Sequence, residues 1–85
     1  MYYVYIIKSL KDNKFYIGQT NNIENRLVKH NKGLVKSTKN RKPFILVFQE
    51  EFISRKEAIN REIYLKSLKG GNEFKRILNK HCRVV

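Results

Sequence analysis

Five residues carry chemistry that a small basic fold does not require: two phenols, a guanidinium, an imidazole and a carboxylate, at Tyr5, Tyr16, Arg26, His30 and Glu62. Hydrolysis of a phosphodiester bond uses all of these groups. It needs a base that deprotonates water, a positive charge beside the phosphoryl group and help for the departing alkoxide. The residue types therefore predict phosphate chemistry, if the fold brings the five positions together.

The acidic residues limit which metal chemistry this set can use. The chain has seven, and most stand at expected turns or exposed helix positions: Asp12, Glu24, Glu50, Glu51, Glu57, Glu62 and Glu73. This argues against a cluster of carboxylates around two metal ions, whereas one hard cation held by Glu62 and water molecules is feasible. An unperturbed phenol titrates near pH ~10, so we expect nearby Lys and Arg side chains to stabilise a phenolate.

Charge points to a polyanionic partner. The 85 residues contain 19 Lys and Arg against 7 Asp and Glu, a formal net charge of +12, and their number suits a single domain. We expect DNA as the partner, with RNA as the alternative. The apolar residues are spread through strand-like runs, which argues against a basic amphipathic membrane binder, and no apolar run approaches the ~20 residues that cross a bilayer.

Cysteine usage favours a reducing compartment. With Cys82 as the single cysteine, no intramolecular disulfide can form, and His30 and His81 are too few to complete a zinc site. The pair His81 and Cys82 could be a metal or redox site, but a frayed terminus is the better explanation. The cysteine usage and an N-terminus that does not resemble a signal peptide together predict a cytoplasmic protein. We also expect a monomer.

A β-hairpin is expected to carry both tyrosines. Residues 2–9 are apolar or aromatic on both faces, which is typical of a central strand covered on both sides. Asp12 and Asn13 suit a two-residue turn, after which residues 15–18 resume the strand pattern.

The expected turn sets a register in which Tyr5 pairs with Thr20 and Ser9 pairs with Tyr16. Tyr5, Tyr16 and Gly18 then project from the same face of the sheet. A glycine inside a strand marks either a bulge or a place where a ligand or another backbone approaches closely, and both explanations remain open.

A helix is expected to follow the hairpin directly. Asn21 can cap it with Glu24 at the third helical position, and the helix should end near residues 31–33. At ~100° per residue, Arg26 and His30 both border its buried face, so they can point at one ligand. A solvated surface arginine is the alternative for Arg26.

Residues 31–43 combine five Lys or Arg with a glycine and a proline, which predicts a mobile basic loop. Solvated charge is the usual role of such a run. Its place after a candidate phosphate site favours contacts to a nucleic-acid backbone, which we assign to Lys29, Lys36, Lys39, Arg41 and Lys42.

The second half of the chain is expected to supply one strand and two helices. Residues 44–52 form the most continuous apolar run, which predicts the core strand. Ser54 and Glu57 have the spacing of a capping box, and they predict a helix over 55–68. A last helix should start at Asn72, with a frayed tail over 79–85.

Glu62 breaks the pattern of the 55–68 helix. The apolar arc expected from Ala58, Ile59, Ile63 and Leu65 places this carboxylate near its middle. Acidic side chains are seldom buried unless they are paired or bind a metal. Two explanations stay open: a salt bridge to Arg26, Arg55 or Lys66, or a metal ligand.

The segments Tyr3-Val4-Tyr5 and Tyr16-Ile17-Gly18, with Arg26, His30 and Glu62 on later helices, together resemble the GIY-YIG nuclease superfamily. The resemblance covers residues 2 to about 78, and it is greatest to small single-domain bacterial members akin to the catalytic domain of the excision-repair nuclease. It implies an α+β fold with a three-stranded antiparallel sheet flanked by about three helices. The implied activity is DNA endonuclease of low sequence specificity, with a role in repair or in cutting particular DNA structures.

The resemblance also implies a role for each residue. Tyr5 matches the proposed general base and Tyr16 the tyrosine that orients water and phosphate. Arg26 matches the arginine that stabilises the phosphoryl charge, and His30 a histidine that assists the phosphate or the leaving group. Glu62 matches the single metal ligand, for Mg²⁺ or Mn²⁺.

Three positions depart from the family pattern. Tyr3 stands where the first motif opens with glycine, and Gln19 stands where several members carry a basic residue, which should weaken activation of the base. For the late asparagine of the family, Asn72 is the nearest match. A non-catalytic nucleic-acid-binding module of the same fold is therefore the alternative function, and a protein that binds an acidic protein partner is a third.

Overall fold

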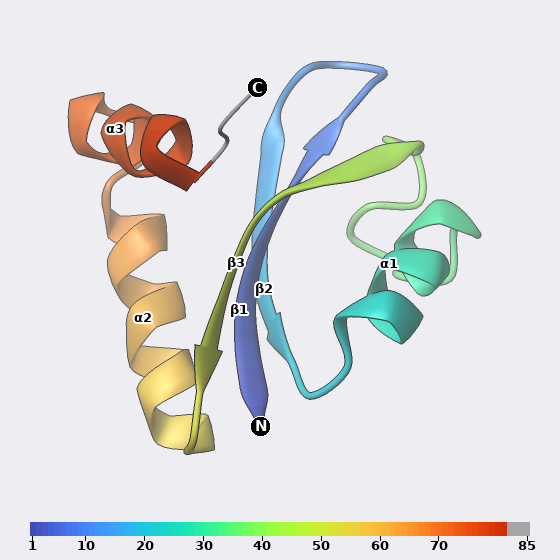
Figure 1. Ribbon diagram of the computed structural model, residues 1–85. Helices are drawn as coiled ribbons and strands as arrows, with labels where there is room; N and C mark the ends of the chain where they lie inside the picture. The colour runs from blue at the N-terminus through green and yellow to red at the C-terminus, as the bar shows by residue number, and fades with distance from the viewer. Residues whose placement is uncertain (82–85) are drawn as a thin grey trace.

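The computed structural model describes residues 1–81. The elements, in chain order, are β1 (Tyr2–Ser9), β2 (Phe15–Thr20), α1 (Ile23–Asn31), β3 (Phe44–Phe52), α2 (Arg55–Ser67) and α3 (Asn72–His81). The strands form one antiparallel sheet in the order β2-β1-β3. One face of this sheet is covered by α1 and the other by α2 and α3 (Figure 1). The expected α+β architecture is confirmed.

Strand β1 is central, as its two apolar faces predict, and Val4 to Ile7 are all buried. The expectation that residues 44–52 form the core strand is wrong, because β3 lies at an edge of the sheet. Phe44 and Phe48 are buried there, but Ile45 between them is exposed. An apolar run alone cannot tell a central strand from an edge strand whose outer face is left uncovered.

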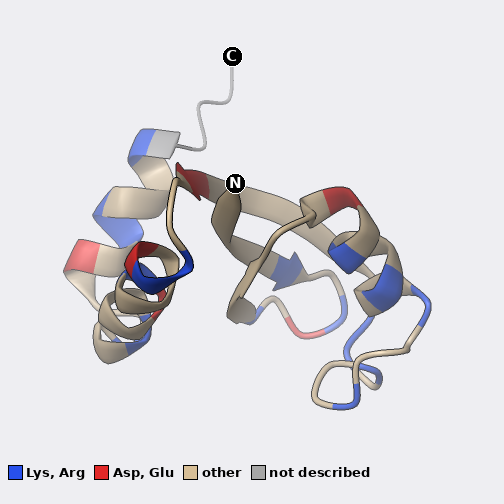
Figure 2. Ribbon diagram, turned by 90° about the horizontal axis from the view of Figure 1, so that it is seen from below, with Lys and Arg blue, Asp and Glu red and all other residues tan. Residues whose placement is uncertain are grey.

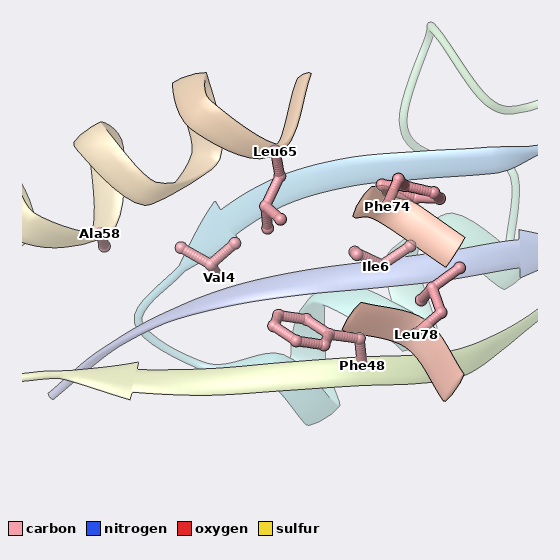
Figure 3. Packing of buried hydrophobic residues seen from close by; sticks show 7 residues of the cluster. All are labelled: Val4, Ile6, Phe48, Ala58, Leu65, Phe74 and Leu78. Carbon is pink, nitrogen blue, oxygen red and sulfur yellow. The ribbon is translucent and has the colours of Figure 1, made fainter. Parts of the chain in front are cut away.

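The sheet separates two apolar clusters. The larger one, between the sheet and the α2–α3 layer, consists of Val4, Ile6, Phe48, Ala58, Leu65, Phe74 and Leu78 (Figure 3). The smaller one lies under α1 and contains Tyr5, Ile7 and Phe44. Because Tyr5 belongs to a packed cluster, its ring is held in place by the fold.

The hairpin register differs from the expected one by two residues. Tyr5 lies opposite Gly18, and Thr20 lies opposite Tyr3. The cause is a longer loop, in which the Ser9 hydroxyl accepts hydrogen bonds from the backbone N–H groups of residues 11 and 12, and Asn13 adopts a positive φ of 60°. Side chains alternate with a period of two, so a slip of two residues leaves every side chain on its expected face.

Helix α1 begins one residue later than expected. Asn22, not Asn21, is the N-cap, and its side chain accepts a hydrogen bond from the backbone N–H of Asn25. The Thr20 hydroxyl accepts from the N–H of Asn22, which holds the chain extended up to the cap. The helix ends at Asn31, within the expected range.

The basic segment after α1 is anchored at several points, contrary to the mobile loop that its composition predicts. Thr38 is buried, and the Ser9 hydroxyl donates to the carbonyl of Arg41 at 2.6 Å. The Asn31 side chain accepts from the N–H of Phe44 at 2.6 Å and donates to its carbonyl at 3.2 Å. These polar side chains, absent from any apolar pattern, tie the loop to both strands beside it.

Helix α2 starts with the expected capping box, formed by Ser54 and Glu57. Its apolar arc is narrower than expected, because Ala58 and Leu65 are buried while Ile59 and Ile63 are exposed. The sheet covers only one strip of this helix. Glu62 lies at the border of that strip, with 18% of its side chain exposed.

Helix α3 starts at Asn72 as expected and buries Phe74 and Leu78 against the sheet. It continues through residue 81, so residues 79–81 are helical where a frayed tail is predicted. Cys82 and the rest of the predicted tail lie outside the described residues. Within residues 1–81, no helix has the length and apolar character needed to cross a membrane.

Candidate active site around Tyr5

Tyr5 and His30 form a buried hydrogen bond at the centre of the α1 face of the sheet. The Tyr5 hydroxyl oxygen lies 2.9 Å from Nε2 of His30. Tyr5 is 2% exposed and His30 is fully buried. His30 comes from the last turn of α1, so the packing of this helix on β1 sets the distance between the two side chains.

Thr38 contacts the second ring nitrogen of His30. Its hydroxyl oxygen lies 2.7 Å from Nδ1 and 3.4 Å from the carbonyl oxygen of Val35. If the hydroxyl donates to that carbonyl, it accepts from an Nδ1–H of His30, which leaves Nε2 without a proton. Nε2 is then free to accept the hydrogen bond of Tyr5. The order of polar groups is therefore Tyr5, His30, Thr38 and the backbone of Val35.

His30 is neutral at physiological pH. Burial of the ring lowers the pKa of His30 from 6.5 to about 4, and the positive charge of Arg26 acts in the same direction. Both effects penalise the imidazolium form. A neutral imidazole is the form that can accept a proton.

Tyr5 is a neutral phenol. Burial raises the pKa of Tyr5, and this outweighs the opposite effect of the hydrogen bond and positive charge that Arg26 offers to its hydroxyl. The charges of Tyr16 and Glu62 also raise it. The expectation that nearby cations stabilise a phenolate is therefore not met, because desolvation of the ring outweighs Arg26.

Arg26 has an unpartnered donor beside this pair. Its Nε atom is buried and makes no hydrogen bond to any of the described residues, which is rare for a buried polar atom in a folded protein. The pKa of Arg26 is raised, first by its interaction with the Tyr5 hydroxyl, so the side chain stays charged. It also lines a cavity of about 300 Å³ with Gln19 and Arg55, where an anion would meet two guanidinium groups.

Tyr16 packs beside the same pair. Its ring centroid lies 6.4 Å from that of Tyr5 and 5.0 Å from that of His30. Gly18, two residues further along β2, pairs regularly with Tyr5, so the strand has no bulge there. The space above Gly18 is filled by Tyr5 itself, whereas we expected either a bulge or the approach of a ligand or backbone.

Glu62 is paired with a residue of its own helix. It lies on α2, and its Oε2 atom is 2.8 Å from Nζ of Lys66, so the expected salt bridge to Lys66 is present. Its charge nevertheless acts on Tyr5, whose pKa it raises. Among the described residues, no three His, Cys, Asp or Glu side chains come together to hold a metal ion.

The expected nucleic-acid contacts fall into two groups. Lys29, Lys36, Lys39 and Lys42 are exposed, and the basic residues follow α1 and the loop after it (Figure 2). Arg41 instead pairs with Asp12 at 2.8 Å and lies over the ring of Phe44. Asn72, the candidate for the late asparagine, is exposed at the start of α3, in the layer on the other face of the sheet.

Two residues of the site are not among those expected from the sequence. Thr38 orients the His30 ring through its contact with Nδ1, and Asn31 anchors the loop that carries Thr38 by its hydrogen bond to Phe44. Neither follows a helical or strand period, so hydrophobic patterning could not find them. A lone threonine among lysines, eight residues after the histidine, is too weak a signal to single out.

The family model of the GIY-YIG catalytic domain matches residues 1–75 of this chain. The chain belongs to the GIY-YIG family. A UPF0213 protein of Staphylococcus haemolyticus is 46% identical over 77 residues, which cover 89% of this chain and 93% of that protein. A UPF0213 protein of Clostridium perfringens is 43% identical over 84 residues, covering 98% and 89%. The NMR structure of a UPF0213 protein from Bacillus halodurans is 36% identical, covers 89% of this chain and 94% of that one, and has a TM-score of 0.48.

Membership of the GIY-YIG family makes this a domain of the nuclease class, with a nucleic acid as the implied substrate. GIY-YIG nucleases generally use divalent metal ions. The two tyrosines, the arginine and the histidine that carry the resemblance are brought together by the fold, and the glutamate is linked to them through its charge.

Proposed function

We propose that this GIY-YIG domain is a metal-dependent endonuclease that hydrolyses DNA phosphodiester bonds with low sequence specificity. The observation that carries the proposal is the chain of neutral groups from Tyr5 through His30 to Thr38, next to the unpartnered Nε of Arg26. A structural core would satisfy that donor. A monomer in the cytoplasm, acting in repair or on particular DNA structures, is part of the proposal.

Tyr5 acts as a proton relay and not as a preformed phenolate. The attacking water gives a proton to the Tyr5 hydroxyl oxygen while the Tyr5 proton passes to Nε2 of His30, at 2.9 Å. The water oxygen forms its bond to phosphorus as the bond from phosphorus to the leaving oxygen breaks, and the leaving oxygen takes a proton from solvent water. Thr38 holds the ring so that Nε2 is the nitrogen that receives the proton.

The substrate itself favours this transfer. The charge of Arg26 is one of the two effects that keep the His30 pKa low. A phosphodiester bound at Arg26 brings a negative charge that offsets it, so the imidazolium becomes less costly when substrate is present. His30 therefore serves Tyr5, and not the leaving group as the resemblance implies, because both of its ring nitrogens are already used.

Arg26 and Tyr16 position the phosphate in this proposal. The Nε of Arg26 donates to a phosphoryl oxygen, and the guanidinium balances the charge that develops during attack. Tyr16 stands beside Tyr5 and orients the water and the phosphate. Arg55, which lines the same cavity as Arg26, supplies the positive charge that Gln19 does not.

Glu62 fits a single-ion site. Mg²⁺ is commonly held by one or two carboxylates together with water and substrate phosphate, and this side chain is a carboxylate whose charge acts on Tyr5. Its present partner is Lys66, which would give up the contact. When bound, Mg²⁺ or Mn²⁺ would polarise a phosphoryl oxygen and stabilise the developing charge.

The alternative is a nucleic-acid-binding module that does not cleave. The salt bridge between Glu62 and Lys66 favours it, since a paired carboxylate is a poorer metal ligand. Such a module would bind DNA or RNA with an affinity that falls steeply with salt. Substitution of Glu62 would leave that affinity unchanged. A protein whose partner is an acidic protein would bind neither nucleic acid at low salt.

A nicking assay on supercoiled plasmid, branched DNA and RNA, with Mg²⁺ or Mn²⁺, separates these functions. We expect the wild-type protein to nick DNA, and Glu62→Ala and Tyr5→Phe to reduce the rate about a hundredfold or more. Glu73→Ala is the matched control, because Glu73 pairs with Arg76 on α3, away from the candidate site, and should cleave as the wild type does. Intact DNA with the wild-type protein would leave only a binding function, and full activity of Glu62→Ala would overturn the role of Glu62 as the metal ligand.

A further inference from the structure

A second cavity lies at the other end of β2 from Arg26. Its volume is about 570 Å³, within the range of ~300–1,000 Å³ that is usual for ligand sites. Residues of β2 and the preceding turn form one wall, and the end of α2 with the start of α3 forms the other. The lining residues are Asn13, Lys14, Phe15, Tyr16, Ile17, Leu65, Lys66, Lys69, Gly70 and Phe74.

The interior of this cavity is apolar and partly aromatic. Leu65 and Phe74 are buried, and Figure 3 shows both of them directed from their helices toward the sheet. Phe15 packs edge to face on Phe74, with 5.4 Å between ring centroids, and is itself 39% exposed. An exposed phenylalanine on a rigid strand, with an apolar surface behind it, is a platform on which a nucleobase can stack.

The rim of the cavity is cationic. Three lysines line it, Lys14, Lys66 and Lys69, and the described residues that form the lining include no acidic side chain. An apolar floor under a positive rim suits a ligand with a flat apolar part and an anionic part. A nucleotide has both, because its base is flat and its phosphates are negative.

Two residues of the lining connect the cavity to the candidate active site, which lies on the other face of the sheet. Tyr16 lines the cavity and also packs beside Tyr5 and His30. Lys66 lines it and pairs with Glu62 at 2.8 Å. A strand whose phosphate lies at Arg26 and Tyr5 would reach this cavity by passing around β2, an edge strand of the sheet, so that a nucleotide further along the strand enters it.

We infer that the cavity between β2 and the α2–α3 turn binds an unstacked nucleobase of the strand that is cut, with Phe15 as its stacking surface. This inference rests on the proposed function and adds a substrate class to it. A base inside a regular duplex cannot reach such a cavity, so the preferred substrate is single-stranded or locally unpaired nucleic acid.

The test measures binding without a metal ion, so cleavage plays no part in it. The probes are two fluorescein-labelled single strands of about seven nucleotides, one of thymidines and one with the same backbone but no bases. Fluorescence anisotropy gives the affinity of each. We expect the wild-type protein to bind the thymidine strand about tenfold more tightly, since stacking of a base on an aromatic side chain has about that effect.

Phe15→Ala should abolish this difference, while Ile45→Ala, which truncates an exposed apolar residue on β3, should keep it. A measurement on the wild-type protein covers the case in which Phe15→Ala does not fold: NMR shifts of the Lys69 and Gly70 amides should respond to the thymidine strand and not to the strand without bases. Equal affinity of the wild-type protein for both strands would overturn the base-binding cavity. Failure to bind either strand would overturn the single-stranded substrate class, whereas the proposed function is overturned only if the wild-type protein leaves DNA intact in the nicking assay.

Discussion

A Cβ atom added at Gly18 would lie 2.5 Å from the hydroxyl oxygen of Tyr5 and 2.7 Å from its Cζ. The glycine in the middle of β2 is therefore needed to make room for the phenol that stands opposite it in the sheet. Because that phenol is also bonded to His30, the residue at position 18 controls whether the pair can form at all.

Gly18→Ala should consequently destabilise the protein by about 1–3 kcal/mol, as overpacking usually does, and displace the Tyr5 ring from His30. A double-mutant cycle with Tyr5→Leu checks the cause by urea unfolding. If the ring is responsible, Gly18→Ala will cost much less in the Tyr5→Leu background. An equal cost in both backgrounds would place the strain in the β2 backbone and not at Tyr5.

Thr38 should fix the tautomer of His30. Thr38→Val removes the hydroxyl that faces Nδ1 and leaves a buried N–H without a partner, at a cost of about 1–3 kcal/mol. The nicking rate should fall by about tenfold or more, because Nε2 is no longer the sole acceptor for Tyr5. Thr38→Ser keeps the hydroxyl and should restore most of the activity.

The tautomer can also be measured directly. In the wild-type protein, ¹⁵N NMR of the His30 ring should show the proton on Nδ1 and an unprotonated Nε2, as the contacts to Thr38 and Tyr5 require. Thr38→Val should give a mixture of the two neutral forms. A wild-type ring with its proton on Nε2 would contradict the direction of the relay.

Stability should fall on mild acidification because of His30. Its pKa is about 4 in the folded protein against 6.5 for an ordinary histidine, so below 6.5 the unfolded chain binds more protons than the folded one. The stability that the neutral ring contributes is complete above about pH 6.5 and is lost as the pH falls through about 4. Urea unfolding between about pH 7.5 and 5 measures this loss above the range in which most carboxylates titrate.

Two variants isolate the contribution of His30 to this pH dependence. His81→Asn removes the only other histidine of the sequence and should leave the loss of stability between about pH 6.5 and 5 in place. Asp12→Asn should change the pH dependence of stability only at lower pH, because the pKa of Asp12 is lowered from 3.8 to about 2, chiefly by its hydrogen bond to Arg41. Stability that stays constant from about pH 7.5 to 5 in His81→Asn would show that His30 titrates normally.

Patterns of residue type predict the elements of this fold well, and the contacts of the site much less well. Apolar periodicity and capping residues identify every strand and helix of the described chain, because each depends on neighbours a few positions away. The hairpin register depends on how Ser9 and Asn13 fold the loop, which composition does not reveal. Because the register is shifted by two residues, each side chain still lies on its expected face. Tyr5, Tyr16 and Gly18 are therefore correctly predicted to share one face.

The contacts of Glu62 and Thr38 could not be predicted from patterns of residue type. A helical wheel places Glu62 near the apolar arc, but only the packed structure decides that Lys66, and not Arg26 or Arg55, is its partner. The partner of His30 comes from a loop without periodicity. The first case depends on how the helix packs in the folded chain, and the second depends on the conformation of a loop. Patterns of residue type predict neither of these.

The basic loop should contribute to affinity through its exposed lysines and to stability through its arginine. Lys36, Lys39 and Lys42 are exposed, so replacing all three with Gln should lower the salt dependence of duplex binding by up to about three in the slope of log K against log salt. The melting temperature should hardly change. Lys75→Gln, on α3, is the matched control for the loss of a surface charge outside the loop.

Arg41 should behave in the opposite way, although it belongs to the same run of basic residues. It is bonded to Asp12 and lies over Phe44, and its backbone carbonyl accepts from Ser9. Arg41→Gln should therefore cost about 0.5–1 kcal/mol in the free energy of unfolding and leave the salt slope nearly unchanged. A slope that drops by about a full unit in Arg41→Gln would mean that this side chain leaves Asp12 to bind phosphate, and that the ion pair is exchanged for DNA.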